Sequence, residues 1–137
     1  MSLKAQTAKE LFGEGYNCAQ AVFVVFAEDY GISKNAALKL SSSFGGGVGR
    51  MHEMCGAVLG MVMALGLAEG NTEKEKKLEH YEKVRKLVTE FSERNGGYIC
   101  RELIASGDKK SCAEFVYSAV EILENYIGLK ILIESFL

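Results

Sequence analysis

The chain has 137 residues, of which 48% are hydrophobic and 25% charged, and its formal net charge is −2 at pH 7. This length is enough to bury a continuous core, so we expect residues 1–137 to form a single helical four-cysteine domain. Lysine and arginine are interleaved with glutamate rather than gathered in a basic stripe, which excludes a typical nucleic-acid-binding surface.

The N-terminal residues, from Met1 to Lys4, lack the apolar segment of a secretory signal. No apolar run reaches the roughly 20 residues that a membrane-spanning helix needs. We therefore expect a cytoplasmic protein with no membrane span. In that compartment its cysteines stay reduced unless they have a redox or metal-binding task.

Apolar residues recur with a helical period almost throughout, and the chain contains no proline. This pattern predicts an all-α fold, a single-domain helical bundle of about five main helices plus a short helical segment. The first helix is expected over residues 2–12. Asn17 and Gln20 predict a capping box that starts a second helix, which should run to about Tyr30 with Cys18 at its first position.

Ser33 is expected to cap a third helix that ends near Ser43. Residues 44–50 are then too rich in glycine to be helical. An apolar helix is predicted over 53–68, with Cys55 in its first turn. Its glycines, Gly56 and Gly60, lie one turn apart and should let a neighbouring helix pack closely.

Thr72 and Glu75 predict a second capping box, at the start of a long amphipathic helix that ends near Arg94. Its side chains divide into an apolar stripe and a charged face, on whose solvent side we place His80. The predicted buried stripe consists of Leu78, Tyr81, Val84, Val88 and Phe91.

Cys100 is predicted to open a short helical segment that ends at Gly107. Ser111 and Glu114 predict a third capping box, which places Cys112 at the first position of the last helix. After Gly128 the segment 129–137 is too apolar to be left in water. We expect it either to complete the core or to be buried against a second copy, giving a homodimer through the C-terminal tail.

Four cysteines, each predicted at or near a helix start, are the most informative residues: Cys18, Cys55, Cys100 and Cys112. Unpaired N–H groups and the positive end of the helix dipole favour thiolate at such positions. The cysteines are too far apart in sequence for the close pairs of zinc ribbons or thioredoxins. A shared site must therefore be assembled by the tertiary fold, with the four helix starts meeting at one end.

Four soft sulfur ligands that converge predict an iron–sulfur cluster or another thiophilic metal, in an electron-transfer or redox-sensing protein with a redox protein partner. Two alternatives stay open. One is thiol–disulfide exchange through a cysteine pair. The other is a helical interaction module whose cysteines are core residues. Whether the protein is an enzyme is left open by all three.

The glycine-rich loop before Cys55 is the second candidate element, and its Gly45, Gly46, Gly47 and Gly49 are predicted to bind the cofactor. Their backbone N–H groups can donate hydrogen bonds to an anion or to the sulfurs of a cluster. The alternative is a tight reversal between two helices. A P-loop is excluded, because no lysine followed by serine or threonine stands at the required spacing. His52 is a candidate ligand or proton donor, or else simply a solvated loop residue.

Several stretches resemble the C_GCAxxG_C_C family of redox-active proteins, which is defined by four cysteines and a Cys-Gly-Ala-x-x-Gly element. The four cysteines of this chain match that pattern, and CGAVLG at 55–60 supplies the element; the other matching stretches are 15–22, 44–50 and 100–103. The resemblance implies a small helical protein with redox activity. A related domain lies beside haem-binding segments in some cytochromes, but no CxxCH motif occurs here, so we expect no attached haem.

Overall fold

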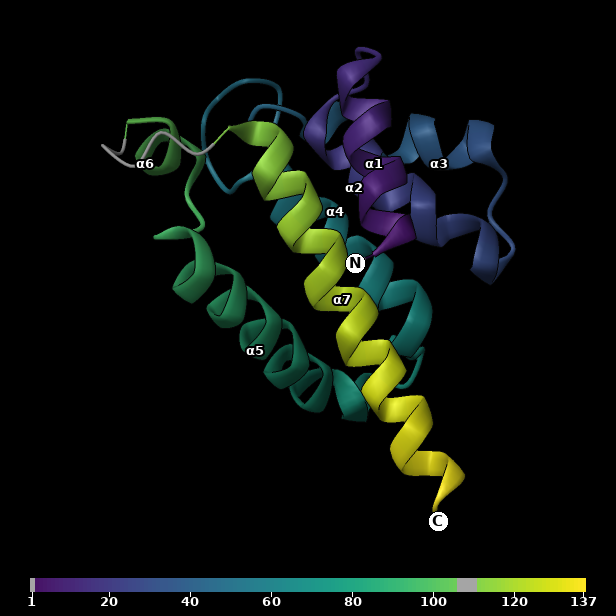
Figure 1. Ribbon diagram of the computed structural model, residues 1–137. Coiled ribbons are helices and arrows are strands. Elements are labelled where there is room, and N and C mark those ends of the chain that lie inside the picture. Colours follow the sequence, from purple (N-terminus) through teal and green to yellow (C-terminus); the bar gives the residue numbers. More distant parts are fainter. Residues whose placement is uncertain (1, 106–110) are drawn as a thin grey trace.

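The computed structural model describes residues 2–105 and 111–137, and within them the chain is helical with no named strand (Figure 1). The predicted all-α class is confirmed, although six longer helices are present where about five were expected. The helices are α1 (Leu3–Gly13), α2 (Cys18–Ala27), α3 (Lys34–Ser41), α4 (Gly56–Glu69), α5 (Lys77–Asn95), α6 (Cys100–Ala105) and α7 (Cys112–Ser135). Short 3-10 turns follow α2 and α3 and precede α5; they are η1 (Glu28–Tyr30), η2 (Ser42–Phe44) and η3 (Lys74–Lys76).

The core is built around α2, which packs against α1, α3, α4 and α7 and buries eight of its ten residues. Its closest neighbour is α4. A Cβ atom added at Gly60 would lie 2.7 Å from the carbonyl oxygen of Ala19 and 3.0 Å from the Cβ of Val22. Only glycine leaves room for this approach, so the prediction of close packing at Gly56 and Gly60 is confirmed.

Side-chain caps start several helices where the sequence predicts them. Asn17 and Gln20 form both halves of a capping box at α2. Ser33 caps α3, and the hydroxyl of Ser111 accepts from the N–H of Glu114 at α7. The capping box predicted at Thr72 is wrong: η3 leads into α5, which begins at Lys77 without a side-chain cap.

The predicted buried stripe of α5 is wrong in its first half. Leu78 and Tyr81 are 67% and 49% exposed, whereas Leu87 and Phe91 are buried and Val84 and Val88 are half-buried. Helical spacing explains the difference, because positions 84, 87, 88 and 91 share one face and 78 does not.

His80 continues the buried face of α5 one turn towards its start, so its predicted solvent position is also wrong. The side chain is half-buried, and its Nδ1 atom is shielded from solvent with no hydrogen-bond partner among the described residues.

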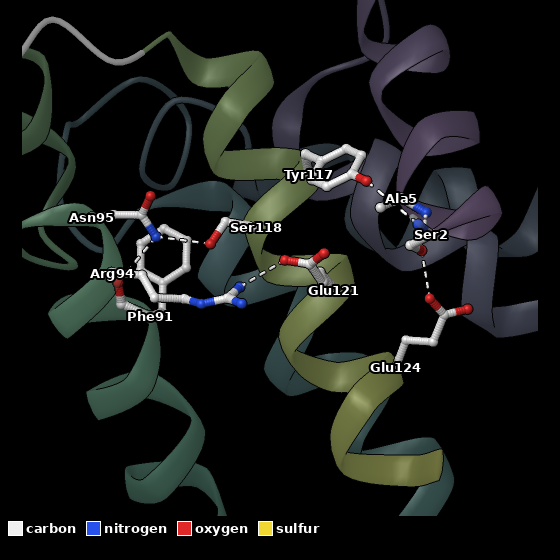
Figure 2. A network of polar contacts seen from close by, with 9 residues as sticks. All are labelled: Ser2, Ala5, Phe91, Arg94, Asn95, Tyr117, Ser118, Glu121 and Glu124. Carbon is white, nitrogen blue, oxygen red and sulfur yellow. Dashed lines mark hydrogen bonds and ion pairs between the residues drawn. The ribbon is translucent and has the colours of Figure 1, made fainter. Parts of the chain in front are cut away.

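The first half of α7 is tied to its neighbours by polar contacts (Figure 2). Asn95 donates to the Ser118 hydroxyl at 2.9 Å, and Arg94 pairs with Glu121 at 3.1 Å, which joins α7 to α5. On the other side the Ser2 hydroxyl donates to Glu124 and joins α7 to the start of α1. These contacts fix the helix whose first residue is Cys112.

The second half of α7 runs beyond the other helices, at the lower end of the molecule in Figure 1. Gly128 does not end the helix, which continues to Ser135. A glycine inside a helix costs only about 1 kcal/mol relative to alanine, and its neighbours here are good helix formers. The tail is exposed, so the expectation that it completes the core is wrong. None of the described helices has the length and apolar character to cross a membrane.

Candidate redox site

Each cysteine lies at a helix start. Cys18, Cys100 and Cys112 are the first residues of α2, α6 and α7, as predicted. Cys55 is the N-cap residue of α4, one position outside the helix rather than in its first turn. Cys18 and Cys55 are buried, Cys100 is half-buried and Cys112 is exposed, and none is in a disulfide. The four thiols thus range from the packed core to the surface.

The structure brings these helix starts together at one end of the bundle. The Sγ of Cys18 lies against Gly56, where an added Cβ would overlap it, so Cys18 is a neighbour of the residue that follows Cys55. Electrostatic interactions join Cys55 to Cys18 and Cys100, and join Cys112 to Cys18 and Cys100. Cys18 and Cys100 thus each interact with the three other thiols, which links the four cysteines into one group.

A short antiparallel contact positions Cys55 and Cys100 relative to each other. The N–H of Cys55 donates to the Tyr98 carbonyl at 2.8 Å, and the N–H of Cys100 donates to the Glu53 carbonyl at 2.6 Å. Between them Met54 and Ile99 form an isolated bridge. The sequence does not predict this contact, because one bridged pair of residues is too short to produce an alternating apolar pattern.

The glycine loop lies directly against this contact. A Cβ added at Gly47 would lie 2.9 Å from the Cβ of Cys100 and 2.7 Å from the N atom of Glu53. Gly47 also has a φ of 71°, a left-handed conformation that costs other residues about 1–2 kcal/mol. Gly47 is thus required both for the turn and for the approach of Cys100.

Loop hydrogen bonds divide the four candidate glycines. The N–H of Gly49 donates to the Ser43 carbonyl at 2.8 Å and is occupied. Within the described chain, the N–H groups of Gly45, Gly46 and Gly47 donate to no backbone carbonyl. An N–H without an acceptor can donate to a sulfur, so these three glycines are better candidates than Gly49.

Three non-glycine residues of the loop region also have positive φ: Val48 at 65°, Arg50 at 61° and His52 at 58°. Such conformations cost about 1–3 kcal/mol each and persist where surrounding contacts enforce them. Here the loop is closed by its own hydrogen bonds, including that from the His52 N–H to the Gly46 carbonyl at 3.0 Å. The Nδ1 of His52 lies 3.5 Å from the Sγ of Cys100, which places its imidazole beside this sulfur.

Burial, not the helix dipole, dominates the acidity of three of the thiols. Burial raises the pKa of Cys55 to about 12, although the N–H groups of Val58 and Ala57 act in the opposite direction. The pKa values of Cys100 and Cys112 are also raised, first by burial and then by neighbouring cysteines. Cys112 is exposed as a residue, yet its thiol is shielded enough for this effect. The expectation that helix starts favour thiolate is therefore wrong for these three cysteines.

The donor chemistry of the site fits a soft metal, since it offers four sulfurs. As their side chains stand, however, no three His, Cys, Asp or Glu residues of the described segments are grouped closely enough to hold a metal ion. Rotation about a Cα–Cβ bond can move a cysteine sulfur without moving its helix. The group of closely spaced ligand atoms that a metal ion needs is therefore not formed by the side chains in their present rotamers.

Comparison with known proteins agrees with the cysteine pattern. The model of the family described as "Putative redox-active protein (C_GCAxxG_C_C)" matches residues 16–126, which include all four cysteines. A protein of Archaeoglobus fulgidus, described as uncharacterized, is 32% identical over an alignment of 129 residues, and the match covers 82% of this chain and 85% of the relative. No solved structure matches the chain. The chain therefore belongs to the C_GCAxxG_C_C family, whose description is that of redox-active proteins.

Proposed function

We propose that Cys18, Cys55, Cys100 and Cys112 bind an iron–sulfur cluster or another thiophilic metal, for electron transfer or redox sensing. The observation that best supports this proposal is that four thiols from four helix starts form one group, in which Cys18 and Cys100 each interact electrostatically with the other three. Such a group, when bound, supplies a centre that can change its oxidation state.

The raised pKa values favour this role over nucleophilic chemistry. At pH 7 a thiol with a pKa of about 12, such as that of Cys55, is almost entirely protonated and is a poor nucleophile. A metal ion lowers the pKa of a coordinating thiol, so burial does not prevent it from acting as a ligand. Binding then releases the thiol protons to solvent.

The residues around the sulfurs have supporting roles in this proposal. The N–H groups of Gly46 and Gly47 and the imidazole of His52 lie in the loop beside Cys100. Hydrogen bonds to ligand sulfurs stabilise negative charge on them and tune the reduction potential of a site. The loop would thus set the potential rather than supply ligands.

The test is anaerobic purification and reconstitution with iron and sulfide, followed by visible absorbance and by iron and sulfide analysis per chain. We expect a sulfur-to-metal charge-transfer band in the wild type and its loss in Cys112→Ser, where the exposed position keeps the fold intact. The matched control is Ala113→Ser, which adds a hydroxyl one residue away and should keep the metal. Equal metal content in the two variants, or no metal bound by the wild type, would contradict the proposal.

A second candidate function is thiol–disulfide exchange between Cys100 and Cys112, because these two interacting thiols are the more accessible pair. Their oxidation would release two protons and two electrons, which reduce the disulfide of a partner protein to two thiols. The double variant Cys18→Ala/Cys55→Ala separates the two functions. It removes two metal ligands but leaves this pair, so retention of a glutathione-oxidisable disulfide by mass spectrometry would favour exchange.

A further inference from the structure

A pocket of about 560 Å³ lies between the end of α4 and the start of α5. Gly66 and Leu67 form its wall on the α4 side. The chain turns back sharply at Gly70, where an added Cβ would overlap the carbonyl oxygen of Gly66. A pocket of this volume has the size of a small-molecule site. It is at the end of α4 opposite to Cys55, so it is separate from the proposed redox site (Figure 1).

The wall on the α5 side carries basic side chains. Lys74, Lys77 and His80 line the pocket at intervals of three residues, which places them along one side of the chain. Among the described residues, neither lysine forms an ion pair or a side-chain hydrogen bond. The one carboxylate of the lining belongs to Glu73, which pairs with Lys76 at 3.4 Å. The positive charge of the two lysines is therefore not balanced by a group of the lining.

The unpartnered ring nitrogen of His80 determines which hydrogen bond this side chain offers. Its Nδ1 atom is shielded from solvent, while its Nε2 atom is neither shielded nor hydrogen-bonded in the described part of the chain. A neutral imidazole carries its proton on one of the two nitrogens. Because a buried N–H without an acceptor is costly, the proton is on Nε2, at the accessible side of the ring. His80 lines the pocket, so this N–H is available to an acceptor there.

The start of α5 adds further donors. Neither η3 nor α5 has a side-chain cap, although the hydroxyl of Thr72 is close by in sequence and also lines the pocket. The first N–H groups of such a start have no acceptor within the helix and favour an anion. These groups all donate hydrogen bonds or carry positive charge. A complementary ligand therefore brings hydrogen-bond acceptors and negative charge.

We propose that the pocket binds a small organic phosphate, whose phosphate group accepts hydrogen bonds from Lys74, Lys77 and the Nε2 of His80. A phosphate monoester is close to a dianion at pH 7 and matches the two ammonium groups, whereas a carboxylate brings a single charge. The organic part of the ligand lies against Leu67 and Tyr81, which also line the pocket. The side chain of Tyr81 is 49% exposed, so its ring is accessible to a ligand.

A nuclear magnetic resonance titration of the ¹⁵N-labelled full chain with phenyl phosphate at pH 7 tests the proposal. The chain has two histidines, and His52 lies beside Cys100, so it serves as an internal control for His80. We expect saturable shifts of the His80 Nε2 and of the Lys77 N–H, with a dissociation constant of roughly 1 mM. No shift at His80, or an equal shift at His52, overturns the proposal.

Substitutions test the two walls of the pocket separately. Lys77→Gln should weaken binding at least about fivefold, whereas the matched control Lys86→Gln removes the same charge from α5 outside the pocket and should bind like the wild type. Gly66→Leu should abolish binding while circular dichroism shows the folded protein, because a Cβ added at Gly66 meets nothing within 4 Å. Equal binding by the two lysine variants, or wild-type binding by folded Gly66→Leu, overturns the proposal.

Inorganic phosphate and benzoate, titrated in the same way, test the class of ligand. Inorganic phosphate lacks the part that contacts Leu67 and Tyr81, and benzoate lacks the second negative charge. Each should therefore bind more weakly than phenyl phosphate, by about tenfold or more. Inorganic phosphate that binds as tightly as phenyl phosphate, or benzoate that does so, overturns the assignment of an organic phosphate.

Discussion

A pair of glycine-to-alanine substitutions in α4 tests the packing on which the cysteine site depends. At Gly60 the new Cβ would lie 2.7 Å from the Ala19 carbonyl oxygen and 3.0 Å from the Val22 Cβ, so α2 and α4 must separate. At Gly66, in the same helix, it would meet nothing within 4 Å. The two variants have the same gain in helix propensity and differ only in this contact.

The expected magnitudes follow from two terms. Overpacking of a close contact costs about 1–3 kcal/mol, and replacing a helical glycine by alanine gains up to about 1 kcal/mol. Gly60→Ala should thus lower the free energy of unfolding by about 1–2 kcal/mol, and Gly66→Ala should raise it by about 0.5–1 kcal/mol. For a chain of this length the melting temperatures should then differ by roughly 5–10 °C.

Urea denaturation monitored by circular dichroism measures both changes, and an unchanged m-value shows that the same surface is exposed. The Gly60→Ala variant should also alkylate faster at Cys55 in the folded protein, since α2 and α4 carry Cys18 and the cap position of Cys55. A Gly60→Ala variant that is as stable as the wild type, or two variants whose stability changes in the same direction, would contradict close packing of α2 and α4 at Gly60.

Three further predictions concern the loop, the thiols and the pH dependence. Gly47→Ala should lower the free energy of unfolding, measured by urea denaturation, by about 2–4 kcal/mol, because Gly47 has a positive φ and contacts Cys100. Gly49 also has a positive φ but has open space around it, so Gly49→Ala should lower the free energy of unfolding by only about 1–2 kcal/mol. Iodoacetamide at pH 7 to 9 should modify Cys112 first and Cys55 last by peptide mass mapping, because the pKa of Cys55 is raised to about 12; equal rates in the folded protein would contradict this. Burial opposes ionisation of Glu69, but hydrogen bonds with Lys130, Tyr126 and Lys83 lower its pKa overall. The pKa of Glu69 is lower in the folded than in the unfolded protein, so the stability that this carboxylate contributes is present above pH 4.5 and is lost as the pH falls further. In the Glu69→Gln variant the urea concentration at half-unfolding should therefore fall less steeply below pH 4.5 than in the wild type.

The sequence was sufficient for the fold class and for those helix starts that depend on local chemistry. The capping pair Asn17 and Gln20 and the close approach at Gly60 need only neighbouring residues or the absence of a side chain, and both were predicted. The start of α5 was harder to predict from the sequence. Thr72 and Glu75 have the spacing of a capping box, but the chain enters α5 through a 3-10 turn instead. Local spacing cannot distinguish these two starts.

The positions of the four cysteines at helix starts were predictable, but their electrostatics were not. Helix starts were the correct feature for locating the four cysteines, yet the direction of the pKa shifts depends on burial, which the fold alone determines. The same limit explains the missed contact between residues 53–55 and 98–100. It joins segments more than 40 residues apart through backbone hydrogen bonds, which depend on no particular side chain.

The four cysteines are not equally fixed, and this difference bears on how the site could close on a metal. Cys18 begins α2 and Cys55 caps α4, and these two helices pack closely because Gly56 and Gly60 let their backbones approach. This close packing leaves little room for either cysteine to move. Cys100 lies on α6, which makes no extensive contact with another helix in the described part of the chain and is held mainly through the contact at 53–55.

Cys112 begins a helix that is anchored further along, by Ser118 and Glu121. If the sulfurs close on one centre, the movement should therefore come from the Cys100 side, where few packed contacts must be broken. Amide hydrogen exchange offers a direct comparison: metal binding should slow exchange in α6 by a larger factor than in α2 or α4. An equal change in all three helices would contradict a closure that moves mainly α6.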